Sequence, residues 1–233
     1  MESAAEELRR VGAGLRLVSL GLATLAVNAV AALVVALTLV KPEPNPDLAA
    51  MLARLNREHP AAMTVLLGLG VLAHVLGIAG KVFCLSIPAA SGAVPFIRTA
   101  VACTAIGLSL SFAGQAGGAD ASSAELVQIG SIFTTVGLVF FLRFLSRLAA
   151  YLGSARLLAK TQRVQAGLLV LFLLFFGTML AQSAVGIGPA IVVVALVLVL
   201  GVVILYGMYT RLVVDIRRTT EAAVDYVTEQ GTE

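Results

Sequence analysis

Six long apolar runs constrain this sequence more than any other feature. Each is close to the roughly 20 residues that a helix needs to cross the hydrocarbon core of a bilayer. Hydrophobic residues make up 59% of the chain and charged residues only 12%, which is far more apolar than a soluble domain. No run has the alternating pattern of a barrel strand, so the sequence predicts an all-α, polytopic membrane protein, a bundle of six transmembrane helices. The predicted spans cover about residues 17–40, 61–80, 96–116, 126–146, 164–184 and 190–210.

The first apolar run follows Arg9, Arg10 and Arg16, as the core of a secretory signal would. It is about twice as long as a typical signal core, so we expect an uncleaved anchor. Ser3 and Glu6 have the spacing of a helix capping box, which predicts a helix that begins near the N-terminus and leads into the span.

Lysine and arginine are divided unevenly among the segments that join the runs. Cytoplasmic segments near spans carry the excess of these residues. If the N-terminus lies inside, all but three of the sixteen fall on inner segments, and those three are Lys41, Arg54 and Arg57 in the first outer loop. The charge pattern therefore predicts an N-in, C-in topology. The excess of arginine over lysine, with abundant alanine, glycine and valine, indicates a GC-rich bacterial genome and hence the bacterial cytoplasmic (inner) membrane.

The pattern divides the chain into three parts without a soluble domain. Residues 1–16 start a cytoplasmic helix, residues 17–210 form the six-span bundle, and residues 211–233 form a charged helical tail on the cytoplasmic side. Acidic residues four apart along the tail weaken a helix slightly and are repelled by anionic headgroups. We expect a solvated tail, with a docking helix for a protein partner or a second copy as the alternative.

Four cations follow the fourth run closely, namely Arg143, Arg147, Arg156 and Lys160. The span has used its twenty residues by Arg143, so that side chain can reach the headgroups. Leucines and an alanine recur at helical spacing among these cations, which predicts a helix along the inner surface; they are Leu145, Leu148, Leu152 and Ala155. We interpret the cations as orientation signals and as contacts to anionic phospholipid headgroups. A specific phosphate site is the alternative.

Small and polar residues mark the helix faces that pack inside a membrane. Two ridges at helical spacing predict a tight pair between the first and second spans: Gly21, Thr24, Asn28 and Ala31 on one, and Gly70, Ala73, Gly77 and Gly80 on the other. Six polar side chains are candidates for interhelical hydrogen bonds or solute contacts: Asn28, His74, Gln115, Gln128, Ser131 and Gln182. For His74 we favour an interhelical hydrogen bond over proton or ligand handling.

The sequence carries no recognisable catalytic signature, neither a nucleophile elbow nor a phosphate-binding loop. The two cysteines are not arranged as a metal or redox pair, and all thirteen acidic residues lie outside the predicted spans. We therefore expect no enzyme, no metal and no cofactor. The expected partners are the lipid bilayer and anionic phospholipids, with a protein partner or self-association open and no nucleic acid. The favoured function is a membrane scaffold or accessory subunit; the alternative is a permease or channel for a small neutral solute.

Overall fold

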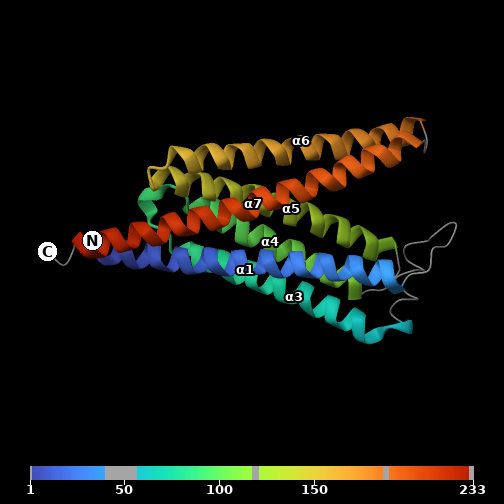
Figure 1. Ribbon diagram of the computed structural model, residues 1–233, viewed down its shortest axis with the longest axis horizontal. Helices are drawn as coiled ribbons and strands as arrows, with labels where there is room; N and C mark the ends of the chain where they lie inside the picture. The colour runs from blue at the N-terminus through green and yellow to red at the C-terminus, as the bar shows by residue number, and fades with distance from the viewer. Residues whose placement is uncertain (1, 40–56, 117–120, 186–188, 231–233) are drawn as a thin grey trace.

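The computed structural model describes residues 2–39, 57–116, 121–185 and 189–230, and it is helical throughout (Figure 1). The long helices are α1 (Glu2–Leu39), α3 (Pro60–Phe83), α4 (Val94–Ala116), α5 (Ala121–Tyr151), α6 (Ala155–Val185) and α7 (Pro189–Gln230). Two short 3₁₀ turns, η1 (Cys84–Ser86) and η2 (Ala89–Ser91), join α3 to α4. Six helices in the described ranges are long and apolar enough to cross a membrane. The prediction of an all-α, multi-pass membrane protein is confirmed at that level.

The first and last helices are much longer than a bilayer requires. α1 has 38 residues and α7 has 42, which makes them roughly 57 and 63 Å long at about 1.5 Å per residue. The hydrocarbon core is about 30 Å thick. Both termini lie at the same end of the bundle, where these two helices run side by side (Figure 1). The segments before the first span and after the last one are therefore continuations of the spanning helices.

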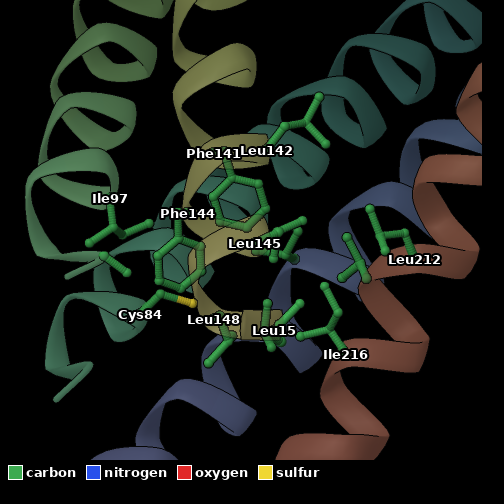
Figure 2. Packing of buried hydrophobic residues seen from close by; sticks show 14 of the residues in the cluster. Leu15, Cys84, Ile97, Phe141, Leu142, Phe144, Leu145, Leu148, Leu212 and Ile216 are labelled. Atoms are coloured by element: carbon green, nitrogen blue, oxygen red, sulfur yellow. The ribbon is translucent and has the colours of Figure 1, made fainter. Parts of the chain in front are cut away.

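The buried apolar core gathers at this end, which we call the terminal end. Phe141, Phe144 and Leu145 of α5 belong to the same buried cluster as Leu15 of α1 and Ile216 of α7 (Figure 2). All five side chains are completely buried. The core therefore joins α1, α5 and α7 at the end where α1 and α7 run side by side.

The tail after the sixth span packs differently from the prediction. Leu212, Val213 and Ile216 are at most 1% exposed, and Thr220 is also buried. The expectation of a solvated tail is wrong for this part of α7. Asp225 and Glu229 are exposed. The buried stripe packs against α1, and Glu221 borders this contact, since a Cβ atom added to Gly12 of α1 would lie 3.7 Å from its Cγ.

The helix expected along the inner surface is also absent from the described structure. α5 continues past Arg143 to Tyr151 as one helix, so Leu145 and Leu148 point into the core. The chain then reverses at Gly153, whose φ of 68° lies in the left-handed region that favours glycine. Ser154 precedes α6 and caps its start, since its hydroxyl oxygen accepts from the Leu157 amide at 3.4 Å. Leu145 and Leu148 do recur at helical spacing as predicted, but they form the buried face of α5 and not a separate helix on the membrane surface.

The predicted tight pair between the first two spans is confirmed. A Cβ atom added to Gly80 of α3 would lie 2.5 Å from the carbonyl oxygen of Gly14 on α1, and one added to Gly21 would lie 2.8 Å from that of Ala73. Side chains larger than hydrogen do not fit at these crossings. The pair is antiparallel, and Asn28 reaches Gly70 farther along it.

A second tight pair, between α4 and α5, follows the same rule. Added Cβ atoms at Gly107 and Gly130 would lie 2.6 and 2.5 Å from each other's carbonyl oxygens, and Gly114 and Gly137 are equally confined by the facing helix. Glycines recur seven residues apart on each helix. This repeat is the signal in the sequence that would have predicted the pair.

Candidate functional site

A polar cavity of about 510 Å³ lies between the α1–α3 pair and the α4–α5 pair. Its apolar wall includes Leu67 and Val71 of α3 and Phe112 of α4. No charged side chain occurs among the described residues that line it. All four helices contribute polar groups, which are Asn28, His74, Ser111, Gln115, Ser131, Thr134 and Thr135.

The cavity brings together four of the six polar residues selected from the sequence, namely Asn28, His74, Gln115 and Ser131. Gln128 is exposed and is not among the lining residues. The side chain of Gln182 lies outside the described residues. Ser111, Thr134 and Thr135 complete the lining and were not selected, because the sequence does not show which faces of α4 and α5 turn toward α3.

His74 forms its hydrogen bond within its own helix. The ring nitrogen Nδ1 lies 2.7 Å from the carbonyl oxygen of Gly70, so the bond that the structure gives His74 is not the expected interhelical one. A carbonyl oxygen only accepts, so Nδ1 carries the hydrogen in this bond. In the neutral ring Nε2 is then an acceptor.

The hydroxyl groups of the cavity are oriented by their own helices in the same way. Ser111, Ser131, Thr134 and Thr135 each donate to the carbonyl oxygen four residues earlier, at 2.9 Å in every case. This back-bonding is the usual state of hydroxyls in membrane helices. Each hydroxyl oxygen keeps lone pairs that can accept a hydrogen bond from another molecule.

Asn28 is the cavity side chain that has a buried hydrogen-bond acceptor without a partner among the described residues. Its Oδ1 atom is buried and accepts no hydrogen bond from the described residues. Its amide nitrogen lies against Gly70, where an added Cβ would be 3.4 Å away. Glycine at position 70 therefore leaves room for the amide at the edge of the cavity.

Lys81 was counted only as an orientation signal, yet the structure places it between three helices. Its Nζ donates to Thr104 Oγ1 of α4 at 2.9 Å and lies 5.4 Å from the centre of the Phe141 ring of α5. A cation over an aromatic face is attracted by the ring quadrupole. Lys81 is seven residues after His74, so both side chains lie on one face of α3. This spacing is the feature of the sequence that could have predicted that Lys81 faces other helices.

The four cations after the fourth span have separate environments. Arg143, Arg147 and Arg156 are exposed, and the Arg147 guanidinium lies 5.9 Å from the centre of the Phe96 ring. Lys160 forms an ion pair with Asp215 of α7. The pair lines a second cavity of about 380 Å³ together with Thr210, Arg211, Val214 and Arg218.

No family model, curated protein or solved structure matches the chain. Among the described residues, no three histidine, cysteine or acidic side chains lie close enough to hold a metal ion.

Proposed function

We propose that the protein is a non-enzymatic scaffold or accessory subunit of a bacterial cytoplasmic membrane, with both termini in the cytoplasm. The observation that carries the proposal is the packed core at the terminal end, where α1 and α7 continue beyond the length needed to cross a bilayer. Leu8, Val11 and Val224 extend the buried contact toward the two termini. The result is a rigid, water-facing platform attached to six spans, which is the form that a docking subunit needs.

The cation distribution supports this orientation. Helix direction alternates along the chain, so the end of α3, the start of α4, the end of α5 and the start of α6 all lie at the terminal end (Figure 1). Lys81, Arg98, Arg143 and Arg163 belong to these helix ends. An excess of cations at one end is the established mark of the cytoplasmic side.

Anionic phospholipids fit the cavity that contains Lys160, Arg211 and Arg218. Three cations share this cavity with one carboxylate, Asp215, which already pairs with Lys160. The excess positive charge lies at the membrane edge in the proposed orientation, where each cation near an anionic surface contributes about 1 kcal/mol. We expect the double variant Arg211→Gln/Arg218→Gln to retain less phosphatidylglycerol after purification than the unmodified protein.

A protein partner is expected on the exposed face of the α7 tail. Tyr226 is 61% exposed there and follows the exposed Asp225 in the sequence. Exposed aromatic side chains on a rigid helix are frequent anchors of protein interfaces. Glu221 forms an ion pair with Arg217 at 3.6 Å, so we expect Tyr226 to provide the main contact.

Purification from native membranes in a lipid-preserving polymer, followed by quantitative mass spectrometry, tests the proposal. We expect a protein in fixed ratio to this chain, and loss of that protein in Tyr226→Ser. The exposed tyrosine Tyr151 on α5 provides the matched control, Tyr151→Ser. The scaffold role is contradicted if the chain is recovered without a stoichiometric protein from the membranes of cells that express it at native level.

A permease or channel for a small neutral solute is the second candidate, and the polar cavity is the observation that favours it. The cavity lacks charge among its described lining residues and lies between two separately packed helix pairs. Proteoliposomes tested for solute-induced swelling by light scattering would detect this activity. Permeation of glycerol above that of protein-free vesicles would replace the scaffold proposal with the permease.

A further inference from the structure

We propose that the polar cavity between the two helix pairs binds a neutral ligand through the hydrogens of the ligand's hydroxyl groups. The ligand is either a free small polyol or the hydroxyl-bearing head of a neutral lipid, because both present the same chemistry. This inference goes beyond the scaffold role and does not require it. A scaffold can hold such a ligand, and a permease would pass it.

The reason is that the cavity offers more acceptors than donors. Every serine and threonine hydroxyl in its lining already donates to its own helix, and His74 donates through Nδ1 to Gly70. What these groups present to the cavity is lone pairs. Asn28 adds a carbonyl oxygen that accepts nothing from the described residues. Only the amide nitrogens of Asn28 and Gln115 remain as side-chain donors.

A charged ligand fits this lining poorly. An anion would face oxygen lone pairs and has no lysine or arginine among the described lining residues. A cation would meet suitable oxygens but no carboxylate, and burying an uncompensated charge is costly. A neutral hydroxyl group meets neither penalty, because its hydrogen satisfies an acceptor and its oxygen can accept from Gln115 or Asn28.

In the proposed orientation the cavity lies at membrane depth, where a hydrogen bond to an acceptor such as Asn28 Oδ1 is favourable. Asn28 is twelve residues beyond Arg16, or roughly 18 Å along α1, and polar groups without partners in hydrocarbon are unfavourable. Each water molecule takes about 30 Å³ in the liquid, so a cavity of about 510 Å³ has room for a solute with several heavy atoms. The apolar wall at Leu67, Val71 and Phe112 suits the carbon skeleton of a polyol or the glycerol region of a lipid.

The protein contains its own reporter for a binding experiment. The Cys84 thiol is completely buried in the terminal core, whereas Cys103 is partly exposed. In a Cys103→Ser background, a thiol-reactive fluorogenic dye reports unfolding through Cys84 alone. A ligand that binds only the folded state raises the midpoint with its concentration, which gives an apparent Kd.

The probes are chosen in pairs that differ in the hydroxyl hydrogens. Erythritol is compared with its tetramethyl ether, and in phosphatidylglycerol nanodiscs diolein is compared with triolein. We expect the hydroxylated member of at least one pair to stabilise the protein and its hydroxyl-free partner to have no effect. Stabilisation by erythritol identifies the free polyol, and stabilisation by diolein alone identifies the lipid.

Variants separate binding from the general stabilisation that polyols give to any folded protein. Ser111→Ala/Ser131→Ala removes two acceptors without adding volume, and should weaken binding by at least about fivefold, since a single hydrogen bond contributes about 1 kcal/mol. Thr64→Val is the matched control, because Thr64 donates to Pro60 in the same way but does not line the cavity. Gln115→Leu provides an independent test if the double variant is poorly folded.

Three results would overturn the proposal. Equal stabilisation by the ethers would show that hydroxyl hydrogens are not recognised. An equal response of the double variant and Thr64→Val would place the effect outside the cavity. No response to any probe would mean that the cavity holds water only. The scaffold role is tested separately, since co-purification measures a protein partner and this experiment measures a ligand.

Discussion

The closest crossing of α1 and α3 provides the sharpest test of the bundle, through the substitution Gly80→Ala. The added methyl carbon would lie 2.5 Å from the carbonyl oxygen of Gly14 and 2.7 Å from the backbone nitrogen of Val18. These distances are nearly an ångström shorter than ordinary van der Waals contact, and both neighbours are backbone atoms that cannot rotate away. The two helices must therefore separate.

The cost of that separation follows from the distance dependence of dispersion. A gap of 0.5–1 Å forfeits about a quarter to a half of the attraction of each contacting atom pair, and overpacking usually costs about 1–3 kcal/mol. We expect Gly80→Ala to destabilise the protein by about 2 kcal/mol. For a chain of this size that lowers a thermal midpoint by about 4–8 °C.

Gly77→Ala is the matched control for this test. It makes the same change one turn earlier on the same helix, where an added Cβ meets nothing within 4 Å. Alanine is the better helix former, so its midpoint should be unchanged or slightly higher. The measurement is the temperature of aggregation in detergent, followed by gel filtration. Equal midpoints for the two variants would refute the close packing of α1 on α3.

The remaining predictions concern single side chains. Thr104→Val should lower the midpoint by several degrees, because Lys81 loses its hydrogen-bond acceptor; Thr99→Val, which removes only a bond to its own helix, should not. His74→Ala should leave the midpoint within about 2 °C, since its hydrogen bond lies within α3; a larger loss would indicate a partner on another helix. Ser154→Cys should resist a membrane-impermeant thiol reagent in intact cells and react after lysis, and strong labelling in intact cells would reverse the proposed topology.

The spans and one helix pair could be predicted from the sequence because each depends on local information. A run of about twenty apolar residues identifies a span without any knowledge of its neighbours. Gly21 and Gly80 could be assigned to a shared contact because both ridges are continuous along one helix face. Gly77 was expected in the same contact, yet an added Cβ there meets open space. Spacing defines a face only to within about a third of the helix circumference.

The environments of Lys160 and Leu148 could not be predicted, because both depend on contacts between distant segments. Lys160 pairs with Asp215, which lies 55 positions later in the chain. The spacing of Leu148 and its neighbouring leucines fits a helix on the membrane surface as well as the buried face of α5. The burial of Leu148 in the structure decides between the two. The polar cavity is a similar case. Asn28, His74 and Ser131 come from three helices, and their meeting depends on how far apart the two helix pairs stand.

In the proposed orientation, solvent accounts for the difference between the packed terminal end and the part of the bundle that holds the polar cavity. In this orientation the terminal end extends into water, where the hydrophobic effect favours the burial of apolar side chains such as Val11 and Leu212. Within lipid there is no such drive, and helices associate only where small residues allow close approach or a hydrogen bond joins them. Tyr206 provides one such bond by donating to the carbonyl oxygen of Leu22. Between the two glycine-lined pairs, the described residues of the cavity wall include the large side chains Leu67 and Phe112, and the hydrogen bonds of its hydroxyl and imidazole groups stay within single helices. Larger side chains placed in the cavity should therefore stabilise the bundle less than the glycine contacts do. A ligand that donates hydrogen bonds to the cavity acceptors would contact both helix pairs and stabilise both.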